Sequence, residues 1–261
     1  MKSALIFIAV IAVLPSTLNG QIQTHDTPAC STYMQCNEIG TASFKQGHLD
    51  QAIQLFEHQA ALAEIADIGR QTSSRDALLN SPYKLSLTAY NNLALAYFAK
   101  HDYFWARAWT LVTLRWDKTN RAAQFNLRKI EQALQKWQWP QTTAGEYVQY
   151  AGRGTWESMV IKPSEPGSIQ FCFSGLWWGL GEGPSGLGDL SATVPFHHGI
   201  AEYSTQEFSE KRCRIAIHFF TDRLEVQQTG DPSDCGFGHN VTANGTFQRI
   251  SSGAECPPEE K

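Results

Sequence analysis

The sequence predicts a multidomain α+β protein in which a stack of helical hairpins precedes an antiparallel β-barrel or sandwich. Between residues 30 and 139, apolar and small residues recur at the spacing of amphipathic helices. After Pro140, glycine, proline, serine and aspartate separate short alternating or β-branched runs, which are typical of strands. The chain of 261 residues is long enough for two domains with cores of their own. We place one domain at residues 30–139 and the other at residues 145–256.

Residues 1–20 have the pattern of a secretory signal peptide. Lys2 precedes an apolar run over residues 4–14, and the small residue Gly20 ends the segment. The run is short for a membrane span, so an uncleaved anchor is the less favoured alternative. We expect a periplasmic or secreted protein with no membrane span after signal cleavage.

The helical domain is clearest over residues 90–119, which predict two helices joined at the polar corner Lys100-His101-Asp102. Asn92-Leu93 returns as Asn126-Leu127 after 34 residues, and an upstream pattern returns after 54, which is 34 plus an insertion of 20. The upstream positions are Ile39, Gly40, Gly47, Ala52 and Phe56, and their counterparts are Leu93, Ala94, His101, Ala106 and Thr110. The domain is therefore predicted to be built from repeats.

The pattern of residues at these positions, together with Tyr97, resembles that of the tetratricopeptide repeat. This repeat is a helical hairpin whose small residues let the helices approach closely. Ser43, Gln59 and Thr110 depart from that family's pattern. The segment 67–82 is rich in serine, aspartate and asparagine, and predicts a loop inserted between repeats. Residues 120–137 predict one capping helix. The alternative is an ordinary amphipathic helical bundle.

The resemblance implies a groove, lined by the first helix of each pair, in which a protein or peptide partner lies. The residues expected to line this predicted groove are Asn37, Thr41, Phe44, Lys45, Asn91, Leu95, Phe98 and Lys129. The Asn91 amide suits pairing with a peptide backbone, and a bond to a neighbouring helix is an equally weighted alternative.

The β half contains six predicted strands. They cover residues 154–161, 168–178, 200–203, 213–220, 223–228 and 240–250. Asn244-Gly245 predicts a hairpin turn. The glycines at 175, 179, 181, 183, 186 and 188 predict bends or a long loop. The half loosely resembles small exported calycin-like β-barrel modules of bacteria, some of which accompany lysozyme-inhibitor domains, and no inhibitor contact residue is carried over.

All six cysteines follow the signal segment, and an even count in an exported chain favours disulfides. Cys30 and Cys36 are close enough in sequence to bridge at a helix start. Pairing Cys213 with Cys235, across two neighbouring strands, leaves Cys172 for Cys256. Buried free thiols are the alternative.

Charge is unevenly distributed between the halves. Residues 21–140 carry 12 basic and 10 acidic side chains, whereas residues 141–261 carry 8 and 15. Neither half is basic enough for a phosphate backbone, so we expect no nucleic-acid partner.

The sequence offers no convincing catalytic, metal or cofactor site. Residues 181–186 spell GxGxxG, but the following residues predict no helix to hold a phosphate. His197 and His198 are predicted to lie on opposite faces of a strand. Trp177 and Trp178 form the densest aromatic spot, where one ring is expected in the core and the other exposed. The exposed ring either anchors a ligand or, as we favour, seats the β half against the helices.

Three functions compete. We favour an exported, non-enzymatic interaction protein whose repeats bind a protein or peptide partner, with the β domain as a second surface. The alternative is a lysozyme-inhibitor-like or ligand-binding protein of the cell envelope. A hydrolase that uses the glycine-rich segment with His197 or His198 is the least favoured.

Overall fold

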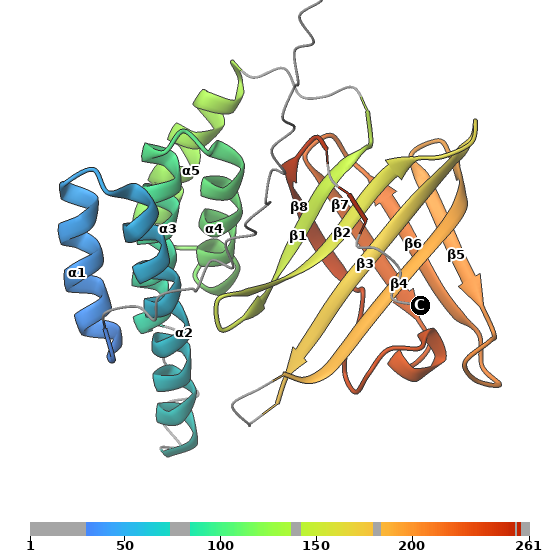
Figure 1. Cartoon of the computed structure of the whole chain (residues 1–261), viewed down its shortest axis with the longest axis horizontal. Coiled ribbons are helices and arrows are strands. Elements are labelled where there is room, and N and C mark those ends of the chain that lie inside the picture. Colours follow the sequence, from blue (N-terminus) through green and yellow to red (C-terminus); the bar gives the residue numbers. More distant parts are fainter. Residues whose placement is uncertain (1–29, 74–83, 137–141, 180–183, 254, 257–261) are drawn as a thin grey trace, which may run out of the picture.

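The computed structural model describes residues 30–73, 84–136, 142–179, 184–253 and 255–256. Figure 1 shows a helical region beside a closed sheet, so the α+β class is confirmed, and the β half is a barrel rather than a sandwich. The signal segment at residues 1–20, together with Trp137 and Trp139, lies outside the described residues. Among the described helices, none combines the length and apolar character that a membrane crossing requires.

Five helices make up the helical region as described. They are α1 (Tyr33–Lys45), α2 (Leu49–Ser73), α3 (Lys84–Ala99), α4 (Tyr103–Trp116) and α5 (Arg121–Leu134). Side-chain caps fix three of the helix starts: Thr32, Asp102 and Asn120 accept from backbone N–H groups in the first turns of α1, α4 and α5. The predicted pair of helices over residues 90–119 and the capping helix are therefore confirmed as helices.

The corners between α1 and α2 and between α3 and α4 have the same geometry. Gly47 donates to the Phe44 carbonyl and His48 to the Ser43 carbonyl, both over 3.0 Å. At positions 54 residues later, His101 donates to Phe98 and Asp102 to Tyr97, over 3.0 and 2.9 Å. Gly47 and His101 both have a left-handed backbone, with φ of 80° and 63°. Both corners are therefore Schellman motifs.

The small residues of the repeated sequence pattern lie where helices touch. Gly40, Ala52, Ala94 and Ala106 are buried. A Cβ on Gly40 would lie 2.6 Å from the Phe56 ring, so α1 and α2 approach too closely there for any side chain. Close helix contact, rather than helix propensity, explains the glycine.

The predicted inserted loop at residues 67–82 is wrong over its first part. Helix α2 continues to Ser73, and residues 74–83 lie outside the described residues. Asp67 is buried, and its carboxylate accepts from the Ser86 backbone N–H at 3.1 Å and from its hydroxyl at 2.8 Å. The polar residue that suggested a loop instead caps the first turn of α3.

Eight antiparallel strands close into a barrel in the order of the sequence. They are β1 (Gly145–Gly152), β2 (Thr155–Pro163), β3 (Ser168–Trp178), β4 (Pro184–His197), β5 (Ile200–Thr205), β6 (Cys213–Phe219), β7 (Arg223–Thr229) and β8 (Gly245–Ser251). Alternate residues point inward, so Met159, Phe171, Ile215, Leu224 and Phe247 meet in one core. Apolar side chains fill the interior of the barrel.

The predictions missed two strands, β1 and β4, and placed a hairpin wrongly. Gly175 lies in β3, and Gly186 and Gly188 lie in β4 rather than in a loop. A Cβ on Gly186 would lie 2.3 Å from the His239 carbonyl oxygen, and one on Gly188 would lie 2.9 Å from the Phe237 ring. The glycines make room for a chain segment that crosses close to the strand.

Asn244-Gly245 forms no hairpin turn. Gly245 begins β8, and the residues just before it belong to no strand. A Cβ on Gly245 would lie 1.7 Å from the Gln149 side-chain oxygen. The Asn244 side chain accepts from the Gln228 backbone N–H at 2.6 Å. A close approach between strands, not a turn, requires this glycine.

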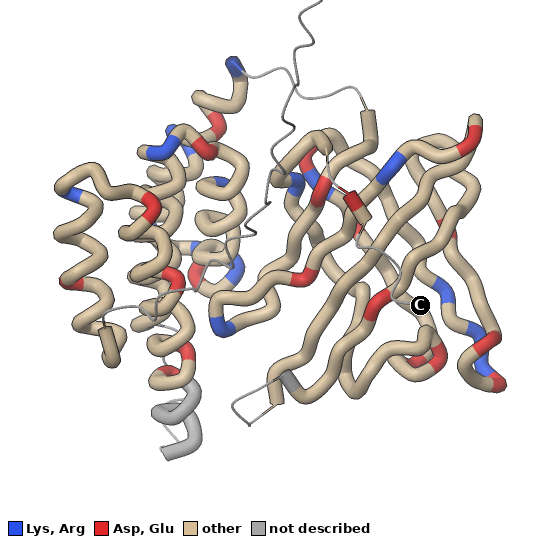
Figure 2. Tube along the Cα trace, in the orientation of Figure 1, with Lys and Arg blue, Asp and Glu red and all other residues tan. Residues whose placement is uncertain are grey.

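Three disulfides have the predicted pairing: Cys30–Cys36, Cys172–Cys256 and Cys213–Cys235. The last does not join two strands, because Cys235 ends a short 3-10 helix (Pro232–Cys235) beyond β7. Disulfides are typical of proteins in an oxidising compartment. Figure 2 shows charged residues of both signs on the helices and on the barrel.

Candidate functional site

Five aromatic rings join the helical region to the barrel. Trp109 of α4 is fully buried and lies 5.7 Å from Tyr90 of α3, 5.1 Å from Tyr150 of β1 and 4.8 Å from Trp156 of β2, measured between ring centroids. Trp105 lies 5.1 Å from Trp156. The hairpin of β1 and β2 therefore covers Trp105 and Trp109.

Glu64 of α2 is buried beside these rings. Its Oε1 atom accepts from the Tyr90 hydroxyl at 2.7 Å and also from the Tyr150 hydroxyl. Its Oε2 atom accepts from the backbone N–H of Arg153 at 2.6 Å. Burial raises the pKa of the Glu64 carboxyl, and the three hydrogen bonds oppose that rise. One carboxyl group thus ties α2 and α3 to the β1–β2 hairpin.

Arg107 of α4 makes a second polar link to the barrel. Its guanidinium donates to Glu131 of α5 at 2.8 Å, to Gln248 of β8 at 2.6 Å and to Asp222 at 2.5 Å. The Arg107 side chain is 12% exposed, so the guanidinium itself is largely shielded from water, while its partner Glu131 is 43% exposed. Aromatic and polar contacts together fix the barrel against α2, α3 and α4.

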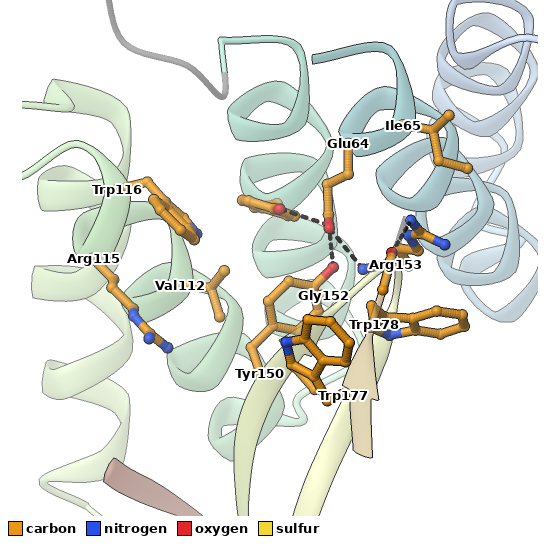
Figure 3. A pocket seen from close by; sticks show the side chains of 13 residues that line it. Glu64, Ile65, Val112, Arg115, Trp116, Tyr150, Gly152, Arg153, Trp177 and Trp178 are labelled. Carbon is orange, nitrogen blue, oxygen red and sulfur yellow. Dashed lines mark hydrogen bonds between the residues drawn. The ribbon is translucent and has the colours of Figure 1, made fainter. Parts of the chain in front are cut away.

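A pocket of about 530 Å³ opens at this junction, and we name it the junction pocket. Its lining residues are Glu64, Ile65, Tyr90, Val112, Arg115, Trp116, Tyr150, Ala151, Gly152, Arg153, Trp177, Trp178 and Gly179. Figure 3 shows Arg115 and Trp116 on one side and Trp177 and Trp178 on another, with Glu64 held by its hydrogen bonds. Its size and mostly apolar lining are those of small-molecule sites.

Glu157 of β2 is a second buried carboxyl group near the pocket. Its Oε2 atom accepts from the Gln149 amide at 3.2 Å. Burial raises the pKa of Glu157 to about 7, while hydrogen bonds from Gln149 and Leu176 and the charge of Arg115 lower it. The carboxyl therefore titrates close to neutrality in the folded protein.

The free energy of unfolding is expected to fall by roughly 2 kcal/mol between about pH 5 and pH 7 through Glu157 alone. The pKa of Glu157 is about 7 in the folded protein, compared with the ordinary value of 4.5. Its contribution to the free energy of unfolding is therefore complete below pH 4.5 and is lost as pH rises through 7. Glu64 is shifted in the same direction. Urea denaturation at several pH values measures this, and Glu157→Gln is expected to flatten the fall. If the free energy of unfolding of that variant depended on pH as in the wild-type protein, the assignment of the fall to Glu157 would be wrong.

The eight residues of the predicted groove lie on α1, α3 and α5, and none lines the junction pocket. Asn37 is already engaged, since its side-chain oxygen accepts from Asn92 at 2.8 Å and from Gln59 at 3.4 Å. The Asn91 amide donates to the Leu87 carbonyl of its own helix at 3.0 Å rather than to a neighbouring helix. Its Oδ1 atom is buried and has no hydrogen-bond partner among the described residues.

The other predicted groove residues differ in exposure. Leu95 is 43% exposed, and Lys45 and Lys129 are also exposed. Thr41, Phe44 and Phe98 are half-buried, and the Phe98 ring lies 5.4 Å from that of Tyr103. Their role in partner binding stays a prediction.

Trp177 and Trp178 both lie at the pocket and both are half-buried, so neither is simply core or exposed. Trp178 donates its indole N–H to Thr155 at 2.9 Å, and the Arg153 guanidinium lies 4.8 Å from its ring. The rings that seat the barrel on the helices are instead those of Tyr150 and Trp156.

Among the described residues, the groups of the hydrolase hypothesis are not brought together, and residues 180–183 of the glycine-rich segment lie outside the described residues. Gly188 lies within β4 and His197 ends that strand, and nine strand residues span roughly 30 Å. His198 lies not on a strand but in a two-residue turn with Gly199, where both have positive φ, 51° and 77°. Cys30 and Cys36 lie with His58 in a potential metal-ligand group, but a disulfide occupies both sulfurs.

Sequence reasoning overlooked Glu64, Arg115, Tyr150 and Arg153. One signal was available, because Glu64 lies among the buried helix positions Phe56, Ala60, Ala63 and Asp67. A carboxylate within an apolar helix stripe predicts a buried, hydrogen-bonded group. Comparison of the chain with protein-family models, with the sequences of curated proteins and with solved structures gives no match.

Proposed function

We propose that the protein is an exported, non-enzymatic interaction protein, in which tetratricopeptide-like helical pairs bind a protein or peptide partner and the barrel is a fixed second surface. The observation that supports this proposal most directly is the pair of Schellman corners at Gly47 and His101, which lie 54 residues apart. Two corners that share hydrogen bonds, backbone conformation and offset support a repeated hairpin over an unrelated bundle. Three disulfides support an oxidising, extracytoplasmic location.

The placement of the barrel leaves part of the helical surface open to a partner. Its aromatic and polar contacts involve α2, α3 and α4, through residues such as Glu64, Tyr90 and Trp109. The first helix of each unit keeps an exposed apolar side chain: Met34 on α1 is 60% exposed, Leu95 on α3 43% and Phe125 on α5 49%. Met34 and Phe125 lie one helical turn from Asn37 and Lys129 of the predicted groove.

These exposed side chains suit a partner segment that presents apolar residues at intervals, as an extended peptide or an amphipathic helix does. The barrel keeps the helical pairs in one orientation, so the partner meets a surface that is already formed. No contact of the described barrel residues favours the lysozyme-inhibitor alternative, which stays a prediction from the sequence.

Site-specific photo-crosslinking tests this proposal. A benzoylphenylalanine at Leu95 of the full chain is expected to give a discrete adduct with a protein of the exported fraction of the producing cell. The matched control carries the same group at Phe208, which is 51% exposed and lies beyond β5. Adding Phe125→Glu to the Leu95 protein is expected to remove the adduct. No adduct at Leu95, or the same adduct at Phe208, would reject the proposal.

A further inference from the structure

We propose that the junction pocket binds a small monocarboxylate with a flat apolar body. This site is separate from the predicted groove, so it goes beyond partner binding. The pocket volume of about 530 Å³ lies within the range of small-molecule sites. It draws its walls from α2, α3, α4, the β1–β2 hairpin and the end of β3, so the whole fold must form before the site exists.

Indole rings supply the apolar walls. Trp116, Trp177 and Trp178 line the pocket, and Trp116 is 41% exposed. The bond to Thr155 and the contact with Arg153 hold the Trp178 ring in one orientation. Trp177 is held through an edge contact with His239, at 5.4 Å between ring centroids. Rings that are already fixed lose little conformational entropy on binding, and they favour a flat ligand.

The charged groups of the pocket favour an anion. Both oxygens of Glu64 are occupied by donors of the protein itself, which leaves that carboxyl little capacity to bind a cation or a hydroxyl group. Arg115 is exposed, and within the described part of the chain it takes part in no hydrogen bond or ion pair, although its charge acts on the nearby Glu157 carboxyl. It stands beside Trp116, with its guanidinium 5.8 Å from the ring centroid, and Figure 3 shows it at the same side of the pocket.

A carboxylate fits this arrangement better than a phosphate or a neutral sugar. A guanidinium binds a carboxylate through two parallel hydrogen bonds, and Arg115 supplies one such group. The Arg153 guanidinium also lies at the pocket, but it donates to the Gly179 carbonyl at 3.1 Å and stacks on Trp178. A phosphate monoester would bring nearly two charges toward the Glu64 carboxyl. A neutral ligand would make no use of Arg115. The ligand is thus placed with its carboxylate at Arg115 and its apolar body against the indoles.

Titration calorimetry with three probes that share a naphthalene body tests the proposal: 2-naphthoate, its isostere 2-naphthamide, and 2-naphthyl phosphate, each against the full chain. The naphthoate is expected to bind about tenfold more tightly than the amide, as suits a charge-assisted pair. Arg115→Gln is expected to reduce naphthoate affinity to that of the amide. Arg214→Gln, at an exposed position of β6 outside the pocket, is the matched control and should change neither. Trp177→Ala should weaken both ligands.

Each other outcome would overturn the assignment. Equal affinity for naphthoate and naphthamide in the wild-type protein would show an apolar site without anion selectivity. Tighter binding of the phosphate would assign a different anion. No saturation by any probe at millimolar concentration would remove the ligand site. The comparison of probes in the wild-type protein needs no variant, so a folding defect in a mutant cannot obscure the result.

Discussion

Replacing Glu64 with alanine is expected to lower the free energy of unfolding by about 3 kcal/mol. The change removes the acceptor of two buried tyrosine hydroxyls and of the Arg153 backbone N–H, and these donors come from α3 and the β1–β2 hairpin. Relief of the buried carboxyl's desolvation offsets part of the loss, which keeps the effect below the sum of three lost bonds. Urea denaturation followed by tryptophan fluorescence measures it, because Trp109 and Trp156 lie at this junction.

Two comparison variants separate this role from a general effect of removing a carboxylate. Glu38→Ala, at an exposed position of α1, is expected to change the unfolding free energy by no more than about 0.5 kcal/mol. Glu64→Gln keeps one acceptor oxygen for the tyrosines but turns an N–H group toward the Arg153 N–H, so its cost should lie between the two. A Glu64→Ala protein as stable as Glu38→Ala would show that the junction does not depend on this carboxyl.

The helices were predictable because their signals are local. Apolar spacing and the polar corner each depend on residues within one or two turns, and the predictions of α3, α4 and α5 followed from them. The disulfide pairing followed from sequence proximity and elimination. The end of α2 was mispredicted because the polar Asp67 binds Ser86 of another helix, a contact that no local pattern reveals.

The strands that escaped prediction are those whose sequence reflects contacts with distant segments. Gly186 and Gly188 look like a loop in isolation, yet they lie in β4 beneath residues 237–239, which follow about 50 positions later. Gly245 likewise reflects Gln149 of another strand. Because β pairing is nonlocal, a glycine that permits close packing has the same local signature as one that permits a turn.

The junction pocket was beyond sequence reasoning for the same cause. Its charged groups come from α2, α4 and the β1–β2 hairpin, and Glu64 and Arg153 are 89 residues apart in the chain. The sequence identified Trp177 and Trp178 as notable, and the structure places both at the pocket. The sequence does not show how the barrel packs against the helices, and that packing decides which groups surround the two rings.

Replacing Trp109 with alanine is expected to lower the free energy of unfolding by about 4 kcal/mol, the larger of the two effects argued here. The indole is fully buried and lies against Tyr90, Tyr150 and Trp156, so alanine leaves a cavity between the helices and the barrel. Only part of that space can close, because two of these rings belong to the barrel hairpin, which the Glu64 and Arg107 bonds also hold. Urea denaturation again measures the loss.

Trp109→Phe is the matched variant, and it should cost only about 1 kcal/mol. It keeps an aromatic ring and removes an indole N–H that is buried with no hydrogen-bond partner among the described residues, so part of the lost packing is offset. Combining Trp109→Ala with Trp156→Ala should cost less than the sum of the single changes, by about 1 kcal/mol, because one contact is counted twice. Strict additivity would mean that the rings stabilise their own halves separately. The junction would then depend on its polar links, the hydrogen bonds that Glu64 and Arg107 make to the barrel.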